Sequence, residues 1–425
     1  MTKIKILGSG KEVGRAGILI EENSRSVLLD YGVNFDEDDR PIFPLHVRPK
    51  DIDVVILTHS HLDHIGAAPS LYISIMPKIG ATPLTLDVSK ILLMDMIKLN
   101  GPYLPFDEQS VNDMLTSAET MDYEKPYEYG DFQVTLMDSG HIPGSASVLV
   151  ETSNNKILYT ADMNTIETKL KNPHKLNGVE ADTLIIESTY STSNHPPRDE
   201  TEKRFIDDVN DVVEKGGIVL VPAFGVSRGQ EIMALLEEKG FGYNIWVDGM
   251  IRDIAELYIA HSNYLRSPGL LLKAMQEQRL VKGWNDRRKA LKQPGVIIAS
   301  AGMMKGGPSL YYLKKLAHNP RNAVFMVSYQ AEKTPGRDIL ETGSYYDGNT
   351  KVEVKARVEW FDFSSHTDRR GILETIKSIQ GIQRVILVHG EPEGQKSLAE
   401  EIRNHNTNLD IIIPDNGDEI NISNT

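Results

Sequence analysis

The chain has 425 residues, 40 % hydrophobic and 25 % charged, a balance typical of a folded protein of two or three domains and unlike that of disordered or fibrous chains. Its 46 Lys and Arg against 60 Asp and Glu give a net charge of −14, so a polyanionic substrate would need a local basic surface or a metal. The absence of cysteine excludes disulfides, iron–sulfur clusters and a thiol nucleophile, and leaves His, Asp and Glu as metal ligands. Since the sequence has neither a membrane-spanning apolar run nor a secretory signal, we expect a cytoplasmic protein.

Short apolar runs separated by polar or Gly-rich turns predict strands through the first part of the chain. These runs are residues 4–8, 17–20, 27–30, 54–58, 132–138, 147–152, 156–162 and 183–189. Helical patterns occur at 87–99 and 106–118, and a further helix is expected to start near Ile65. The pattern indicates a strand-rich, layered region with helices.

From about residue 190, strands and helices alternate strictly, which predicts βαβ units on a parallel sheet. The expected elements are a helix at 200–214, a helix from Ser227, and strands at 218–224, 244–249, 296–302 and 323–328, with helices between them. An alternating strand is expected around 352–362, followed by strands at 384–390 and 410–414, each preceded by a helix.

Three imidazoles and a carboxylate lie within six residues directly after the strand at 54–58. They are His59, His61, Asp63 and His64. At the end of a buried strand such a cluster would be costly to desolvate without a ligand, and this nitrogen and oxygen set suits a divalent metal. The alternative is a solvated polar loop.

Further candidate ligands follow other strands. His141 comes after 132–138, Asp162 ends 156–162, and His389 ends 384–390. Each alone would be an ordinary turn residue, but together they predict a metal site at the strand ends. Asp30, at the end of 27–30, is expected to orient a ligand imidazole through its second ring nitrogen.

The HxHxDH run with His141, Asp162 and His389 resembles the metallo-β-lactamase superfamily, and the resemblance implies an αβ/βα sandwich. It also implies two metal ions, Zn²⁺ with Mn²⁺ as an alternative. One ion would be held by His59, His61 and His141, and the other by Asp63, His64 and His389, with Asp162 bridging them. The fold by itself names no substrate.

Between Asp162 and His389 lies room for a whole inserted domain. Glu187 in IIESTY and His366 in FDFSSHTDRRG resemble motifs A and B of the β-CASP nucleases, with His389 as motif C. Residues 222–231, 301–309 and 326–337 resemble the nuclease subunit of the eukaryotic cleavage and polyadenylation specificity factor and its archaeal homologues. The resemblance implies an α/β protein with a metallo-β-lactamase domain at 1–191 and 364–425 and an inserted β-CASP domain, a parallel sheet flanked by helices, at 192–363.

A His at motif C goes with members of the family that act on RNA, so the resemblance implies a ribonuclease with its active site in a cleft that favours single-stranded RNA. Two metals would activate water and stabilise charge on the phosphodiester, and Asp63, Glu187 and His366 form the catalytic set. His366, held by Glu187, would protonate the leaving 3′ oxygen, giving 5′-phosphate and 3′-hydroxyl products. Glu187 and His366 could instead be a structural ion pair.

The resemblance favours an endonuclease of RNA 3′-end processing or decay. The alternatives are a 5′-to-3′ exoribonuclease, a catalytically silent subunit of an RNA-processing complex, a small-molecule hydrolase and a DNA nuclease. A homodimer, with the strand at 410–414 at its interface, and partners in a processing complex are also implied. We expect a chain that starts directly at the catalytic domain, without the N-terminal K-homology modules of the longest archaeal relatives.

Two turns of the insertion are candidate phosphate sites, because each joins a strand to a helix N-terminus. The first contains Ser227, a candidate N-cap, and Arg228, and the second contains Lys305, Gly306 and Gly307. Plain capped turns are the alternative. A basic cluster fits a solvated helix face better than an RNA track; it consists of Lys282, Arg287, Arg288, Lys289 and Lys292.

Overall fold

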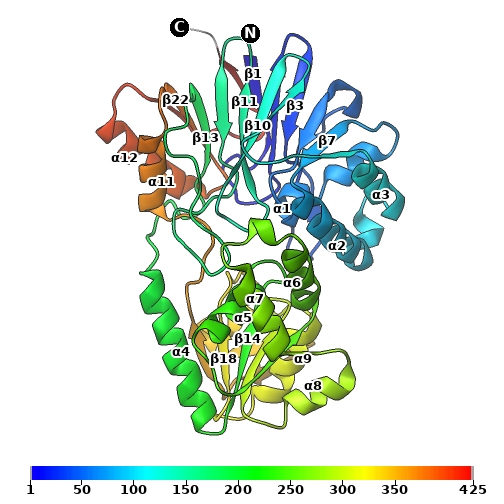
Figure 1. The fold of residues 1–425 in the computed structure, drawn as a ribbon, viewed down its shortest axis with the longest axis vertical. Helices are drawn as coiled ribbons and strands as arrows, with labels where there is room; N and C mark the ends of the chain where they lie inside the picture. The colour runs from blue at the N-terminus through cyan, green and yellow to red at the C-terminus, as the bar shows by residue number, and fades with distance from the viewer. Residues whose placement is uncertain (1, 423–425) are drawn as a thin grey trace. The chain divides into compact units, whose positions relative to one another are not determined.

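A computed structural model describes residues 2–422, which divide into two compact units (Figure 1). Unit 1 comprises the chain up to Glu167, Asn172–Asn194 and the chain from Ser365 onward, and unit 2 comprises Thr168–Lys171 and His195–Ser364. The expected insertion, 192–363, did not include the short segment Thr168–Lys171. That segment joins unit 2 because its backbone bonds there, for example from the amide of Lys169 to Glu231.

Two seven-stranded sheets form the centre of unit 1. The first contains, in spatial order, β24 (Glu419–Ile422), β1 (Thr2–Gly8), β2 (Gly17–Glu22), β3 (Arg25–Leu29), β6 (Val54–Ile56), β7 (Lys78–Ala81) and β8 (Ala118–Thr120). The second contains β23 (Asp410–Ile412), β22 (Arg384–Val388), β13 (Thr183–Glu187), β12 (Lys156–Tyr159), β11 (Ala146–Glu151), β10 (Phe132–Asp138) and β9 (Pro126–Tyr129). Their facing side chains, such as Ile18, Val54, Phe132 and Ile386, make one core, because alternate residues of each strand point inward.

Helices cover both outer faces of this pair of sheets (Figure 1). Over the first sheet lie α1 (Leu62–Ile65), α2 (Pro83–Asn100) and α3 (Glu108–Thr116), and over the second lie α11 (Arg369–Ser378) and α12 (Pro392–His405). Side chains cap three of these helices: Thr82 caps α2, Asp107 caps α3 and Asp368 caps α11. The layers confirm the predicted αβ/βα sandwich.

Short elements complete unit 1. They are the pair β4 (Asn34–Phe35) and β5 (Pro41–Ile42), and the 3₁₀ turns η1 (Pro49–Asp51), η2 (Ala68–Tyr72) and η3 (Gly101–Tyr103). Within residues 2–422, none of the helices has the length and apolarity of a membrane-spanning segment.

Unit 2 has a six-stranded, fully parallel sheet. Its strands, in spatial order, are β16 (Arg279–Leu280), β15 (Asn244–Asp248), β17 (Gly295–Ala299), β14 (Ile218–Pro222), β18 (Ala323–Met326) and β21 (Arg357–Trp360). Its helices are α4 (Arg198–Glu214), α5 (Arg228–Glu238), α6 (Met250–Ala260), the turn η4 (Ser262–Tyr264), α7 (Pro268–Glu277), α8 (Trp284–Ala290), α9 (Gly307–Leu316) and α10 (Pro335–Thr342). A hairpin of β19 (Ser344–Asp347) and β20 (Thr350–Glu353) completes it. The predicted parallel sheet with flanking helices is confirmed.

The structure differs from the local predictions in four places. Residues 352–362 are not one strand, because the amides of Lys355 and Ala356 both bond to the carbonyl of Ala317 and end the hairpin before β21 begins. The helix expected to start near Ile65 ends there instead, since α1 begins within the histidine cluster at Leu62. A further strand, β24, follows β23 and pairs with β1, and the sequence analysis did not predict it. Ser227 occupies the N-cap position of α5, but its side chain makes no capping bond.

Candidate active site

The chemically reactive side chains of unit 1 gather where strands of both sheets end. Residues 59–64 join β6 to α1, His141 lies between β10 and β11, Asp162 follows β12, and His389 follows β22. The backbone turns sharply at these ends: Asp30 has φ 58° and His389 has φ 51°. Residues with a β-carbon seldom adopt such angles, and those that do are concentrated at functional sites.

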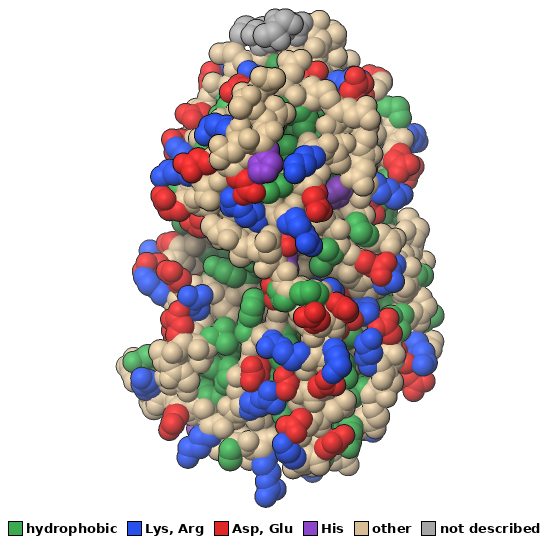
Figure 2. Space-filling model, turned by 90° about the vertical axis from the view of Figure 1, so that its left-hand side faces the viewer, with side chains coloured by type: hydrophobic (Ala, Val, Ile, Leu, Met, Phe, Trp, Pro, Cys, Tyr) green, Lys and Arg blue, Asp and Glu red, His purple; other side chains and the backbone are tan. Residues whose placement is uncertain are grey.

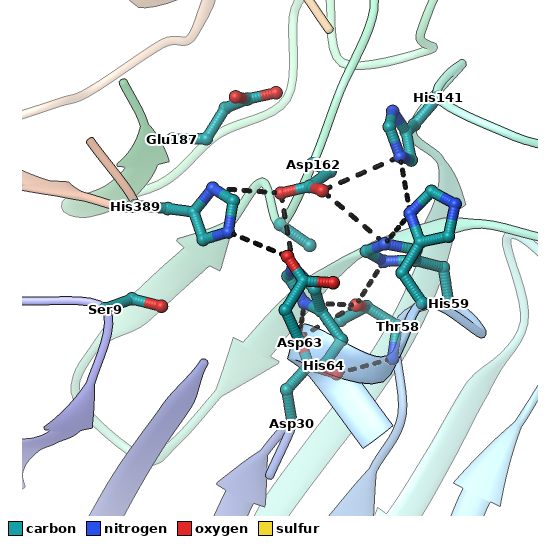
Figure 3. A network of polar contacts seen from close by, with 12 residues as sticks. Ser9, Asp30, Thr58, His59, Asp63, His64, His141, Asp162, Glu187 and His389 are labelled. Atoms are coloured by element: carbon teal, nitrogen blue, oxygen red, sulfur yellow. Dashed lines mark hydrogen bonds and ion pairs between the residues drawn. The ribbon is translucent and has the colours of Figure 1, made fainter. Parts of the chain in front are cut away.

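The first group of converging atoms comes from His59, His61, His141 and Asp162. Figure 3 labels His59, His141 and Asp162 of this group. His61 Nδ1 lies 3.1 Å from His59 Nε2 and 3.3 Å from His141 Nε2. Asp162 Oδ2 lies 3.5 Å from His59 Nε2 and 3.6 Å from His141 Nε2. Burial lowers the pKa of His59 and His141 and lowers the pKa of His61 to about 4, so these rings are neutral at neutral pH and can offer lone pairs.

The second group comes from Asp63, His64, Asp162 and His389 (Figure 3). His64 Nε2 lies 3.3 Å from Asp162 Oδ1, and His389 Nε2 lies 3.4 Å from Asp63 Oδ2. Asp162 therefore belongs to both groups, one through each carboxylate oxygen. The structure thus brings together all seven of the side chains that the sequence named as metal ligands.

Two buried atoms in this cluster lack a hydrogen-bond partner: His64 Nε2 and Asp162 Oδ1. Leaving buried polar atoms unsatisfied costs about 1–3 kcal/mol each, and folded proteins rarely tolerate it without a reason. A divalent cation would satisfy both atoms, and the imidazole and carboxylate donor set suits zinc. The residues present therefore fit the implied metal.

Asp30 holds His64 from behind the cluster. Its carboxylate accepts hydrogen bonds from the amide of Thr58 at 2.8 Å, the hydroxyl of Thr58 at 2.8 Å, His64 Nδ1 at 2.7 Å and the hydroxyl of Tyr159 at 3.2 Å. With its Nδ1 proton donated to Asp30, His64 directs Nε2 toward the cluster. The predicted orienting contact of Asp30 with a ligand imidazole is therefore present in the structure.

Replacing Asp30 by Asn is expected to weaken metal binding by about 10- to 100-fold, because the amide cannot accept all four bonds and removes the charge that holds the Nδ1 proton of His64. Competition with a metal-binding dye measures this affinity. Asp87→Asn, at an exposed position on α2, is the matched control. Equal metal affinities for the two variants and the parent protein would contradict the assigned role.

Glu187 and His366 form a pair beside the cluster. His366 Nδ1 lies 3.0 Å from Glu187 Oε2 and 3.2 Å from Glu187 Oε1, and His366 Nε2 lies 3.7 Å from Asp162 Oδ2. Burial lowers the pKa of His366, but the negative charges of Glu187 and Asp162 outweigh it and raise the pKa to about 9. The ring is therefore protonated at neutral pH, and its Nε2 is the ring nitrogen nearest to Asp162 of the cluster.

Sequence reasoning missed the residues that hold these groups in place. The Thr189 hydroxyl donates to Glu187 Oε2 at 2.7 Å and lies 3.1 Å from His389 Nδ1, so it links the pair to a ligand. The carbonyl of Ser365 accepts from His141 Nδ1 at 2.9 Å. Thr58 lies just after β6, and Tyr159 is the last residue of β12. In the sequence, only their closeness to His59 and Asp162 could have indicated a role at the site.

The candidate phosphate residues lie in unit 2, where loops leave the carboxyl ends of parallel strands. The loop after β17 contains Lys305, which is exposed, and leads through Gly306 and Gly307 into α9. Gly307 has φ 69°, a conformation that glycine adopts freely. Ser227, which ends the loop after β14, and Arg228, the first residue of α5, are each only 7 % exposed. Ligands of parallel sheets bind at this edge. Lys305 and Gly307 are exposed there, whereas Ser227 and Arg228 are buried.

Comparison with known proteins places this arrangement in a family. Residues 230–339 match the Beta-Casp domain, residues 351–414 match the Zn-dependent metallo-hydrolase RNA specificity domain, and residues 2–188 match the anti-Pycsar protein Apyc1. The chain is 44 % identical to RNase aCSPSF2 of Saccharolobus solfataricus over 99 % of its own length and 85 % of the relative's. The chain belongs to the β-CASP family of metallo-β-lactamase hydrolases.

Other relatives of this β-CASP chain bear two kinds of name. It is 34 % identical to the probable RNase MJ4 of Methanocaldococcus jannaschii, with 98 % of the chain and 99 % of that relative aligned. It is also 34 % identical to the transcription termination factor FttA of Pyrococcus horikoshii, with 94 % of the chain and 68 % of that relative aligned. A crystal structure of a protein of unknown function from Enterococcus faecalis V583 shares the fold, with a TM-score of 0.61 at 14 % identity over 99 % of both chains.

Proposed function

We propose that this β-CASP chain is a metal-dependent ribonuclease that hydrolyses single-stranded RNA to 5′-phosphate and 3′-hydroxyl products in RNA 3′-end processing or decay. The observation that carries the proposal is that two ligand groups share Asp162 and stand beside the charged pair of Glu187 and His366. The names of the two RNase relatives support RNA as the substrate.

The metal site would be held by His59, His61, His141 and Asp162 on one side and by Asp63, His64, His389 and Asp162 on the other. Zinc is the proposed metal, and Mn²⁺ is the alternative, because the ligands are imidazoles and carboxylates without thiolates. Bound ions would supply Lewis-acid stabilisation of the phosphodiester and lower the pKa of the attacking water.

The chain's own residues would handle the proton of the leaving group. Protonated His366 would donate from Nε2 to the departing 3′ oxygen, because its Nδ1 is engaged by Glu187. Glu187 is 1 % exposed and is itself fixed by the amide of Met163 at 2.8 Å and by Thr189, so it would hold the ring and favour its charged form. Asp63, partly exposed at the edge of the cluster, would face the attacking water.

RNA contacts would come from local features, since net charge is unfavourable. Figure 2 shows Lys and Arg interspersed with Asp and Glu over the face that it displays. We propose that Lys305 and the amides around Gly306 and Gly307 bind backbone phosphate. The buried Ser227 and Arg228 would shape the neighbouring loop, with phosphate contact limited to what their small exposed surface allows.

An endonuclease is the favoured mode, and cleavage of one unstructured RNA in linear and covalently circular forms tests it. We expect the protein to open the circle, and we expect a chelator and the His389→Ala variant to abolish cleavage. Degradation of the linear form alone, faster with a 5′ monophosphate, would instead establish a 5′-to-3′ exonuclease. Cleavage of neither form by protein with bound metal would contradict the ribonuclease and favour a silent subunit.

A further inference from the structure

We propose that Trp284, backed by Tyr311 and Arg287, is a base-stacking platform on unit 2 for the RNA substrate. This inference rests on the proposed function and names the nucleobase as the chemical group that the surface binds. Trp284 is the first residue of α8 and is 60 % exposed, which is unusual for so large an apolar side chain.

The ring of Trp284 is held by two neighbours. Tyr311 packs against it edge-on, with ring centroids 5.4 Å apart at an interplanar angle of 80°. The guanidinium of Arg287 lies 4.9 Å from the centroid of the same ring and 5.9 Å from that of Tyr311. Such contacts restrict the ring before any ligand arrives, and a restricted aromatic ring loses less entropy on binding.

Arg287 is anchored in turn by the sheet. Its Nε lies 2.7 Å from Asp248 Oδ2 and its second guanidinium nitrogen lies 3.0 Å from Oδ1, a bidentate pair that Tyr312 completes with a hydroxyl at 2.9 Å from Oδ2. Asp248 is the last residue of β15 and is 2 % exposed. The sequence context suggested that Arg287 belongs to a solvated helix face. In the structure it instead fixes α8 to the carboxyl edge of the sheet.

The surroundings of Trp284 suit a polyanion. Residues 282–292 contain five cations and a single acid, and four of the cations are exposed: Lys282, Arg288, Lys289 and Lys292. This local excess of positive charge stands out in a chain of net charge −14. Protein interfaces are depleted in lysine, whereas aromatic side chains set among cations are how proteins bind single-stranded nucleic acid.

The platform also shares its elements with the candidate phosphate loop. Tyr311 and Tyr312 lie on α9, the helix that Lys305, Gly306 and Gly307 lead into. The loops after β15 and β17 touch, because a β-carbon on Gly249 would come within 2.2 Å of the Ser300 hydroxyl. One strand of RNA could therefore place a phosphate at the loop and a base on Trp284.

Binding of fluorescently labelled oligoadenosine to the full chain tests the proposal, with His366→Ala as background to slow cleavage. We expect Trp284→Ala to weaken binding by about 5- to 100-fold, Trp284→Phe to retain most of the affinity, and an abasic oligomer of equal length to bind all variants alike. Tyr243→Ala, which removes another exposed aromatic ring just before β15, is the matched control and should bind as the background does.

Intrinsic fluorescence gives a second measurement. The chain has three tryptophans, of which Trp246 is buried, and stacking should quench an emission component that is missing in Trp284→Phe. Unchanged oligoadenosine affinity in Trp284→Ala, or an equal loss for the abasic oligomer, would overturn the platform; the first result would point to a protein partner. Binding with quenching, together with no cleavage by the metal-loaded protein that retains His366, would support the platform and refute the nuclease. Normal cleavage by that protein, together with unchanged oligoadenosine affinity in Trp284→Ala, would support the nuclease and refute the platform.

Discussion

Replacing Asp162 by Asn is expected to remove most of the bound metal and to lower RNA cleavage by at least about 100-fold. Asp162 contributes one oxygen to each ligand group, at 3.5 Å from His59 and 3.3 Å from His64, so the amide weakens both groups at once. Removing a residue that only orients a metal ligand lowers metal affinity or activity by about 10- to 100-fold, and removing a ligand common to both groups should lower them at least as much. Elemental analysis and the initial rate of cleavage measure the two effects.

Asp410→Asn serves as the control for this substitution. Asp410 forms an ion pair with Arg384 at 2.7 Å and is 54 % exposed, so its loss should leave metal content and cleavage unchanged. Full metal content in the Asp162→Asn protein would refute the shared-ligand assignment. Full metal content with lost cleavage would assign Asp162 to the chemistry alone.

His366→Ala is expected to lower the rate constant of cleavage by about 10²- to 10⁴-fold while metal content and RNA affinity stay close to those of the parent protein. His366 Nδ1 lies 3.0 Å from Glu187 Oε2, and the ring is outside the two ligand groups of the proposed metal site. Its proposed role is to protonate the leaving 3′ oxygen. Measuring kcat and KM separately distinguishes this from a binding role, because a general acid acts mainly on kcat.

A substrate with sulfur in place of the bridging 3′ oxygen gives a sharper test of the same role. Sulfur leaves without prior protonation, so the His366→Ala protein should cut this linkage nearly as fast as the parent does. His318→Ala, at an exposed position after α9, should behave as the parent on both linkages. A defect of equal size on the oxygen and sulfur linkages would rule out proton donation by His366.

Much of the fold followed from patterns that are local in the chain. The strand at 132–138 has the predicted bounds, and α2 and α3 enclose or overlap the predicted helical stretches, because apolar periodicity and short-range capping act within a few residues. The pattern failed where a distant partner decided the outcome. The alternation at 352–362 continues unbroken in the sequence, but β20 pairs with β19 and β21 pairs with β18, so the run divides between two sheets.

The seven side chains of the two groups were named from sequence because they follow the ends of apolar strands and match a recognisable motif. Their supports could not be named this way. Thr189 and Tyr159 are ordinary polar residues until the fold places one against Glu187 and the other against Asp30, which lies 129 positions earlier in the chain. Trp284 was passed over for the same reason, since exposure and the contacts of Arg287 are properties of the folded unit.

Residue types, strand endings and the resemblance of the motifs were thus enough to predict the layered α/β architecture and the β-CASP family, and to name the seven side chains that converge. Only the tertiary structure decided which hydroxyls hold the side chains of the two groups and which cations are exposed. The physical reason is that hydrogen bonds, burial and ion pairing depend on distances between residues far apart in the chain, whereas helix and strand periodicity depends on neighbours.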